Sequence, residues 1–323
     1  MPAKIHAPTP ANLRRLAKVL QRGELVAIPT ETVYGLAGHA LDARACRAIF
    51  RAKGRPASDP LIVHVLDLPH AEQLAEFNAT ARRVARKFWP GPLTLVLPRR
   101  ACVPDIVTSG GPTVALRSPA HPLARRLLQL ARIPLAAPSA NPFSYISPTS
   151  AAHVQQGLGR RIPHILDGGE SAVGVESTVL DLTDPTKPVI LRPGAIDEKM
   201  LGRFLRRKVR VRTGAKPQGL LRAPGLLEKH YSPRTPLRLL RRPVTASAQH
   251  AVILQRQPAG KAAPHTYWLS TRGALAEIAH NLYRVLRETD AAGYREIFIE
   301  PVPPTAGGLA AAINDRIRRA TAK

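Results

Sequence analysis

The sequence is poor in cysteine and in aromatic residues, and both shortages narrow the range of folds. Its 323 residues include two cysteines, Cys46 and Cys102, and neither belongs to a Cys-x-x-Cys pair. This argues against a disulfide framework and against a structural zinc site. Aromatic residues make up 4% of the chain and apolar residues 44%. We therefore expect sizeable cores that are built from aliphatic side chains.

Long apolar segments and common nucleotide-binding motifs are also absent. No apolar run approaches the ~20 residues that cross a bilayer, and the first residues lack the apolar stretch of a signal peptide. We therefore expect a soluble, cytoplasmic protein with no membrane partner. The chain contains no Gly-x-x-x-x-Gly-Lys-Ser/Thr loop and no Gly-x-Gly-x-x-Gly before a helix. Any ATP site must therefore be of another kind.

Acidic residues are scarce, and basic residues outnumber them about two to one. The chain has 48 Lys and Arg against 22 Asp and Glu, a net charge of +26. Such a charge fits a polyanionic partner such as RNA, and it fits equally a general arginine-rich composition. The densest basic cluster, residues 203–212, mixes basic with apolar residues and predicts a helix end followed by a strand. Weak RNA binding therefore stays open.

Apolar segments divide the chain into two α/β parts. Residues 1–212 mix expected strands and helices without strict alternation, which predicts a twisted, open, mixed sheet. Residues 213–236 are rich in Pro, Gly and basic residues and predict a linker. Residues 237–323 predict a small three-layer, Rossmann-like α/β domain. Strands are expected at 25–28, 61–66, 93–97, 113–116, 134–137, 164–166, 177–182, 189–191, 237–240, 251–254, 266–269 and 296–299, and helices at 10–20, 42–52, 79–88, 122–130, 147–154, 273–286 and 307–319.

Two short polar runs, some eighty residues apart, predict a phosphate site. Lys53 and Arg55 flank a glycine after an expected helix, and they offer a compact charge and a planar fork to phosphate oxygens. A glycine-capped helix end with favourable cations explains the same run. Ser139 and Asn141 follow an expected strand, where open α/β sheets bind ligands, although a turn held by their side chains is equally compatible.

Further polar residues lie at expected strand ends. Arg117 could hold a carboxylate, although a surface ion pair is the commoner role of such an arginine. Thr32 could bind a polar substrate or cap the next element, and Ser177 and Arg192 could add to the same site. His64 lies inside an apolar strand, where a core histidine is the commoner case. Because no nucleophile–base pattern is evident, these residues predict a site that works by positioning and electrostatics.

These motifs together resemble those of the YrdC-type threonylcarbamoyl-AMP synthases, in their long, two-domain (Sua) branch. The match covers most of residues 10–236 and, more loosely, the C-terminal part. The matching segments are IPTETVYGL (28–36), KGRP (53–56), PLIVH (60–64), WPGPLTL (89–95), TVALR (113–117), APSAN (137–141), SPT (147–149), GVEST (174–178), LRPG (191–194), APG (223–225), HYSP (230–233) and GLAAAINDR (308–316).

The resemblance implies a YrdC-like catalytic domain over residues 1–212 and a nucleotidyltransferase activity. Such an enzyme condenses L-threonine, bicarbonate or CO2, and ATP into threonylcarbamoyl-AMP and pyrophosphate, with Mg2+ accompanying ATP. A separate transferase, an implied partner, then modifies an adenosine of certain tRNAs. The alternative function is a non-catalytic RNA-binding module of the same fold. A related carbamoyl transferase does not fit, because its Cys-rich zinc segments need more than two cysteines.

The resemblance also assigns roles to individual residues, and it assigns none to a metal. Catalysis is assigned to Lys53, Arg55, Ser139 and Asn141. ATP binding is assigned to Arg55, Asp59, Thr113, Ser139, Ser147, Arg192 and Tyr231, the last from a linker that folds over the site. Threonine binding is assigned to Thr32, His64, Arg117, Ala137 and Ser177, with Arg117 on the carboxylate. Asp59 stands where the family often has Asn, and residues 143–145 are bulkier than the family's frequent glycine.

Overall fold

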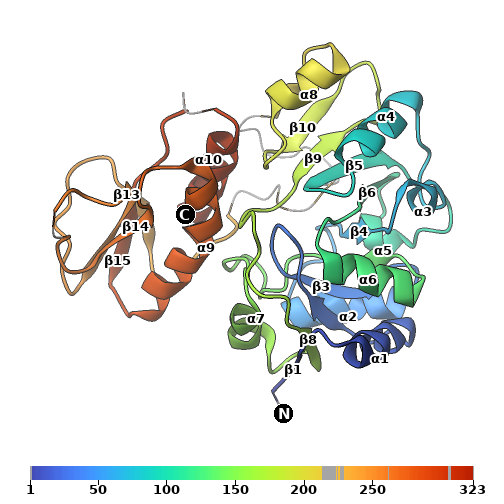
Figure 1. Ribbon diagram of the computed structural model, residues 1–323, viewed down its shortest axis with the longest axis horizontal. Coiled ribbons are helices and arrows are strands. Elements are labelled where there is room, and N and C mark those ends of the chain that lie inside the picture. Colours follow the sequence, from blue (N-terminus) through green and yellow to red (C-terminus); the bar gives the residue numbers. More distant parts are fainter. Residues whose placement is uncertain are drawn as a thin grey trace.

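The computed structural model describes residues 2–212, 223, 225, 229–260, 262–304 and 307–322. Within these residues the chain forms an eleven-stranded sheet and a separate four-stranded sheet. Figure 1 shows the two sheets in two parts of the molecule, with the C-terminal part beside the larger N-terminal part. The predicted division into two α/β parts is therefore confirmed. Most of the predicted linker, 213–236, lies outside the described residues.

The large sheet mixes parallel and antiparallel pairs, as the sequence predicts. Its order is β1-β8-β2-β3-β7-β4-β6-β5-β9-β10-β11. The β4–β6 and β5–β9 pairs are parallel, whereas β5–β6 and β9–β10 are antiparallel. The strands are β1 (Lys4–His6), β2 (Val26–Ile28), β3 (Gly35–His39), β4 (Ile62–His64), β5 (Leu93–Pro98), β6 (Thr113–Arg117), β7 (Leu135–Ala136), β8 (His164–Leu166), β9 (Thr178–Asp181), β10 (Val189–Arg192) and β11 (Arg210–Val211).

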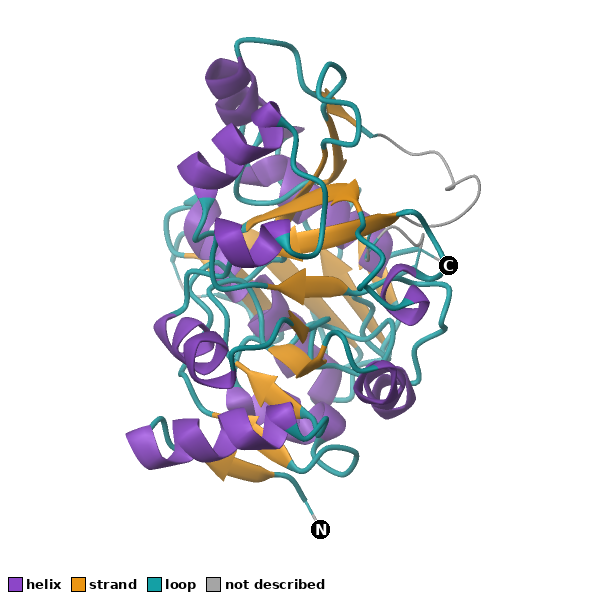
Figure 2. Ribbon diagram, turned by 90° about the vertical axis from the view of Figure 1, so that its right-hand side faces the viewer, coloured by secondary structure: helices purple, strands orange, loops and turns teal. Residues whose placement is uncertain are grey.

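Helices cover both faces of this sheet (Figure 2). One face packs against α1 and α6, which share a core cluster with inward side chains of β2 and β7. The larger core on the other face includes side chains of α2, α4, α7 and α8. The helices are α1 (Pro10–Gln21), α2 (Ala43–Lys53), α3 (Leu68–Glu72), α4 (Ala79–Phe88), α5 (Asp105–Thr108), α6 (Pro122–Ala131), α7 (Ala151–Leu158) and α8 (Glu198–Leu205).

Local sequence signals explain where these helices begin and end. Thr9 caps α1 by accepting a hydrogen bond from the Asn12 amide, and proline occupies the first turn. Asp42 caps α2 in the same way. Gly54 ends α2 with φ at +64°, a left-handed conformation that glycine adopts without strain. This turn carries the chain from Lys53 directly into Arg55.

Strands β1 and β3 and the short helices α3 and α5 were not expected from the sequence, and one expected helix begins later than predicted. The helix expected from residue 147 begins at Ala151, because the preceding segment makes tertiary contacts: the Ser147 hydroxyl donates to Glu176 and the Pro148 carbonyl accepts from the Tyr34 amide. Strand β3 was not expected at all. Its glycine-interrupted sequence gives no clear alternation, and its pairing with β2 and β7 forms the strand.

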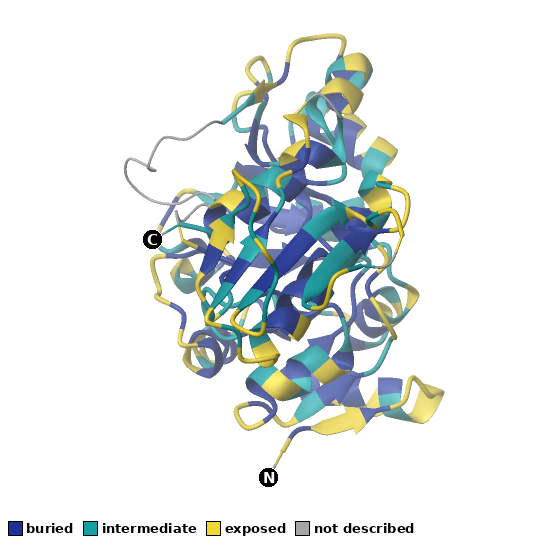
Figure 3. Cartoon of the chain, turned by 90° about the vertical axis from the view of Figure 1, so that its left-hand side faces the viewer, coloured by how far each residue is buried: buried dark blue, intermediate teal, exposed yellow. Residues whose placement is uncertain are grey.

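The C-terminal domain is a parallel sheet with order β12-β15-β13-β14. Its elements are β12 (Leu237–Leu239), β13 (His250–Arg256), β14 (Thr266–Ser270), α9 (Leu275–Ala291), β15 (Glu296–Ile299) and α10 (Leu309–Ala320). Both helices lie on the side facing the first domain (Figure 1), and Figure 3 looks onto the opposite, partly exposed face of the strands. Among the described residues the domain thus has two layers, which corrects the three expected.

The two domains share a continuous core. Val33, Ile146 and Val175 of the first domain belong to one hydrophobic cluster with buried side chains of α9 and α10. The Arg287 guanidinium of α9 donates to the Ile146 carbonyl at 2.5 Å, and the Tyr145 hydroxyl donates to Asp290 at 2.7 Å. The second domain is therefore held against the loops that bear the polar motifs.

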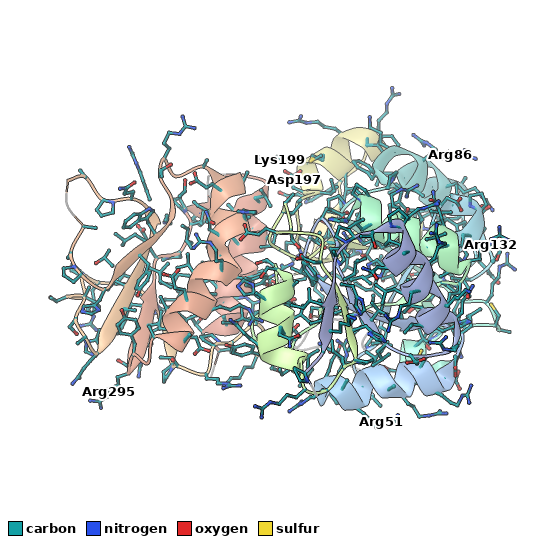
Figure 4. The ribbon with its side chains drawn as sticks, turned by 60° about the horizontal axis from the view of Figure 1, so that its bottom comes forward. Arg51, Arg86, Arg132, Asp197, Lys199 and Arg295 are labelled. Carbon is teal, nitrogen blue, oxygen red and sulfur yellow. The ribbon has the colours of Figure 1, made fainter. Side chains whose placement is uncertain are left out.

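Exposed cations are distributed over both domains. Figure 4 shows Arg51 of α2, Arg86 of α4, Arg132 after α6 and Arg295 before β15 pointing to solvent on different sides of the molecule. This spread favours a general arginine-rich composition over one dedicated RNA surface. None of the helices in the described part of the chain has the length and apolarity needed to cross a bilayer.

Candidate active site

A cavity lined mainly by polar residues lies at the edge of the large sheet where β4, β6 and β10 end and β9 begins. Its volume is about 40 Å³, which is room for a few water molecules. Nine of the residues singled out in the sequence line it: Thr32, Arg55, His64, Arg117, Ala137, Ser139, Ser177, Arg192 and Tyr231. The fold therefore gathers into one place motifs that are up to about 200 residues apart in the chain.

Lys53 joins the two phosphate-site motifs directly. Its ammonium group donates to the carbonyl oxygens of Ser139 at 2.5 Å and Asn141 at 2.6 Å, and the residue is 2% exposed. Burial, together with the charge of Arg55, lowers the pKa of Lys53 well below its usual value. A phosphate anion would reverse this effect, because it favours the charged ammonium form.

Arg55 lies beside Lys53 and is paired within its own loop. Its guanidinium donates to the backbone carbonyls of Asp59 at 3.0 Å and Pro60 at 2.6 Å, and it forms an ion pair with the Asp59 carboxylate at 3.0 Å. Burial raises the pKa of Asp59, against the effect of the neighbouring cations. Asp59 therefore fixes Arg55 in place, whereas the sequence resemblance assigned it to nucleotide binding. That assignment stays a prediction.

Arg117 is held in a polar cluster that suits recognition of a carboxylate. Its guanidinium donates to the Thr32 hydroxyl at 2.8 Å and to the Gly91 carbonyl at 3.2 Å, and it pairs with the Glu31 carboxylate at 2.7 Å. Burial would raise the pKa of Glu31, but the charge of Arg117 and its hydrogen bond hold it below its usual value. Because the Arg117 guanidinium pairs with the Glu31 carboxylate, its position and orientation also suit the carboxylate of a ligand.

His64 lies next to Arg117 in the register of the β4–β6 pair. It is 3% exposed, and its Nδ1 atom has no hydrogen-bond partner among the described residues. Burial, reinforced by the charge of Arg117, lowers the pKa of His64 to about 3. His64 is therefore neutral at physiological pH and contributes an uncharged ring to the cavity lining.

This lowered pKa predicts a pH-dependent stability. The folded His64 stays neutral below pH 6.5 while the unfolded one takes up a proton, so the free energy of unfolding falls as the pH drops from about 7 toward 3. Between pH 7 and pH 5 the His64 contribution to this loss is about 2 kcal/mol. Urea unfolding of His64→Gln at both pH values should show a loss smaller by that amount. If the free energy of unfolding falls equally in wild type and His64→Gln between pH 7 and pH 5, the lowered pKa of His64 is contradicted.

Ser177 and Arg192 form another part of the cavity lining. The Arg192 guanidinium donates to the Ser177 carbonyl at 3.1 Å and to its hydroxyl at 3.2 Å, and that hydroxyl also bonds Thr94 at 2.8 Å. The neighbouring Glu176 accepts a hydrogen bond from the Ser147 hydroxyl at 2.6 Å. Ser147, which the resemblance assigned to ATP binding, is thus connected to this part of the lining.

His230 and Tyr231 close the cavity from the linker side. Tyr231 is 1% exposed and has a φ of +63°, which is unusual for a bulky residue. Its hydroxyl and the His230 Nδ1 have no hydrogen-bond partner among the described residues. Gly225 makes room for them, since a Cβ atom there would lie 2.6 Å from the Tyr231 hydroxyl. Two residues that each have a buried polar atom without a partner among the described residues therefore line the cavity.

One candidate lies away from this group. Thr113 begins β6, four residues before Arg117, and does not line the cavity. The two residues are separated by roughly 13 Å along the strand. The role of Thr113 near the nucleotide stays a prediction, as do the individual roles of the other candidates. Three further candidates do not line the cavity themselves but are hydrogen-bonded to residues that do. These are Lys53, Asn141 and Ser147.

The structure adds two buried ion pairs that the sequence reasoning did not predict. Glu31 pairs with Arg117, and Glu176 with Arg316 of α10. Glu31 and Glu176 are parts of quoted motifs, which was a usable signal, but their partners are 86 and 140 residues away in the sequence and could not be read from it. Within the described residues, no group of three or more His, Cys, Asp or Glu side chains could hold a metal ion.

Comparisons with known proteins cover both domains. The family described as "Telomere recombination" matches residues 18–194, and the family described as "Threonylcarbamoyl-AMP synthase, C-terminal domain" matches residues 196–322. A threonylcarbamoyl-AMP synthase of Pyrococcus abyssi is 40% identical over 96% of this chain and 94% of that protein. One of Bacillus subtilis is 38% identical over 95% and 92%.

A solved structure extends this match to the fold. The crystal structure of P. abyssi Sua5 complexed with L-threonine matches with a TM-score of 0.90 and 37% identity, and it covers 99% of this chain and 98% of that one. The family expected from the sequence motifs is thereby confirmed. The chain belongs to the threonylcarbamoyl-AMP synthase family, in its two-domain form.

Proposed function

We propose that this enzyme condenses L-threonine, bicarbonate or CO2, and ATP into threonylcarbamoyl-AMP and pyrophosphate. The observation that carries the proposal is one cavity lined by Arg117, Arg55 and Arg192, with Lys53 directly behind it. A carboxylate and a polyphosphate are both anions that such a cavity attracts. The family's members are named for this product, and the P. abyssi relative was crystallised with L-threonine.

The threonine subsite is proposed at Arg117. Its guanidinium is the group for the amino acid carboxylate, and Thr32, His64, Ala137 and Ser177 line the same cavity. The Glu31 carboxylate now on Arg117 would have to share that guanidinium or move when threonine binds. A neutral His64 adds no second positive charge beside Arg117. The subsite is thus suited to one carboxylate.

The ATP subsite is proposed beside Lys53, Arg55 and Arg192. These cations would neutralise the phosphates, and the backbone around Ser139 and Asn141 is fixed by Lys53. Mg2+ is proposed as part of the substrate, bound by the phosphates of ATP. The described residues contain no cluster of His, Cys, Asp or Glu that would bind Mg2+ without ATP, which is compatible with Mg2+ arriving bound to ATP.

Binding of ATP requires that His230 and Tyr231 leave the cavity. The space of about 40 Å³ is far below the ~300–1,000 Å³ of pockets that bind drug-sized ligands. We propose that these two side chains withdraw to admit ATP and return over the bound substrates. Their orphaned polar atoms would then find partners in the ligand. The returned side chains of His230 and Tyr231 would also exclude water from a labile product.

The chemistry needs alignment and charge neutralisation, without a covalent enzyme intermediate. The threonine amine and bicarbonate form a carbamate and release water. A carbamate oxygen then attacks the α-phosphorus of ATP, the bond to the β-phosphate oxygen breaks, and pyrophosphate leaves with the electron pair. Negative charge gathers on the transferring group and on the leaving group, so pre-placed cations stabilise the transition state. A separate transferase is proposed to take the product onward to tRNA.

Pyrophosphate release tests the proposal. Purified protein with Mg2+ and ATP should release pyrophosphate when L-threonine and bicarbonate are both present. Omission of L-threonine should reduce the rate to background, and omission of bicarbonate from degassed buffer should do the same. Release that ignores threonine would contradict the proposal. Absence of release, together with RNA binding by a folded sample, would favour the RNA-binding alternative, which has no specific structural support.

A further inference from the structure

The C-terminal domain contributes two buried side chains to the wall of the candidate site. Arg316 of α10 has a side chain that is 1% exposed, and Tyr283 of α9 is fully buried. Both contact the Glu176 carboxylate: the Arg316 Nε at 2.8 Å, and the Tyr283 hydroxyl at 3.0 and 3.1 Å. Glu176 itself lines the cavity. A group at the site is therefore held mainly from the other domain.

Glu176 links this contact to the proposed ATP subsite. Tyr283 contacts both carboxylate oxygens of Glu176, and one of them, Oε1, also accepts a hydrogen bond from the Ser147 hydroxyl at 2.6 Å. Burial would raise the pKa of Glu176, but the charges of Arg316 and Arg192 hold it below its usual value. Glu176 therefore remains an anion in a buried place, and its position depends on its cationic partner.

Arg316 also holds the backbone on both sides of the Ser177–Arg192 contact. Its guanidinium donates to the Pro193 carbonyl at 2.8 Å and to the Glu176 carbonyl at 3.3 Å. Glu176 precedes Ser177 in the chain, and Pro193 follows Arg192. One planar, five-donor side chain thus connects the start of β9 to the end of β10. The same guanidinium lies 5.4 Å from the centre of the Tyr231 ring.

We propose that Arg316 is a positioning residue for the ATP subsite, so that the C-terminal domain is a working part of the active site. The inference rests on the proposed function. Loss of Arg316 leaves the Glu176 carboxylate buried without its cation, and a buried unpaired charge moves or takes up a proton. Ser147, Arg192 and Tyr231 then lose their fixed places. The Arg117 guanidinium at the threonine subsite has its own anchors in the first domain and keeps its place. Ser177 lies next to Glu176, but the carboxylate of threonine depends mainly on Arg117, so its affinity should change far less than that for ATP.

The experiment compares Arg316→Met with Arg318→Met. Arg318 lies on the same helix and shares Asp315 as an ion-pair partner, but its side chain is 52% exposed. We expect Arg316→Met to raise the KM for ATP at least tenfold and to lower kcat, with the Kd for L-threonine, measured by calorimetry, within twofold of wild type. Arg318→Met should match wild type in all three.

A second pair of variants separates positioning from simple domain docking. Glu176→Gln added to Arg316→Met removes the stranded charge and keeps a hydrogen-bonding amide, so it should recover part of the lost ATP affinity. Tyr283→Phe keeps the ring, loses only the hydroxyl, and should raise the KM for ATP a few-fold. This variant carries the test if Arg316→Met fails to fold.

The outcomes are distinguishable. If wild type releases no threonine-dependent pyrophosphate, the proposed function fails. If wild type is active and the variants keep the wild-type KM for ATP, the proposed function stands and the inference about Arg316 is overturned. Equal losses of ATP and L-threonine binding, with no recovery in the double variant, would also overturn it, because they indicate that Arg316 only docks the domains.

Discussion

Replacement of Arg117 by glutamine should lower kcat/KM for L-threonine by about 10²–10⁴-fold, since loss of one partner of a buried ion pair costs about 3–5 kcal/mol. Arg117 is 4% exposed and carries the Thr32 and Glu31 contacts at once. Without it, the amino acid carboxylate loses its cation and Glu31 becomes an unpaired buried charge. Steady-state kinetics with L-threonine varied, together with calorimetric titration of L-threonine, measure the effect.

Two further variants make this prediction specific. Arg126→Gln changes an exposed arginine of α6, and it should behave as wild type. Arg117→Lys keeps the charge but loses the planar fork, so it should recover only part of the activity. Wild-type affinity for L-threonine in Arg117→Gln, in a folded sample, would place the threonine carboxylate elsewhere.

Replacement of Lys53 by methionine should abolish measurable pyrophosphate release, a loss of at least about 10³-fold, because two effects combine. The carbonyls of Ser139 and Asn141 lose their buried donor, and each unpaired group costs about 1–3 kcal/mol. The ATP phosphates also lose a nearby cation. Arg51→Met, at an exposed position on the same last turn of α2, is the matched control.

Stability and activity separate the two effects of Lys53. Urea unfolding should show that Lys53→Met loses roughly 2–6 kcal/mol while a folded population remains for assay. Activity normalised to that folded population should still be lost. If the normalised activity of Lys53→Met equals that of Arg51→Met, Lys53 supports the loop alone and takes no part in handling phosphate.

Elements with complete local signals were predictable from the sequence. Helix α4 begins and ends where expected because Asn78 caps it and apolar residues repeat on one face. Strands β8 and β15 have the predicted bounds. By contrast, β3 and the start of α7 depend on contacts with distant segments. Local residue propensities carry no information about such contacts. The C-terminal sheet is covered on one side because the described connections from β12 to β13 and from β13 to β14 contain no helix.

The site was predictable to the extent that polar residues follow strands. Arg117 and Arg192 are strand-end cations, and the fold places both on one cavity. Their partners could not be predicted in the same way, because a contact such as that between Glu176 and Arg316 joins residues 140 positions apart. The resemblance to a family pointed to the residues, and the structure shows what holds each of them.

Identification of the product tests the central claim most directly. The protein is incubated with Mg2+, ATP, L-threonine and ¹³C-labelled bicarbonate, and the mixture is separated at once and analysed by mass spectrometry. The account predicts one adduct that contains AMP, threonine and the labelled carbon, formed in equal amount to pyrophosphate. An adduct of AMP and threonine without the labelled carbon, or pyrophosphate with no adduct at any time, would contradict it.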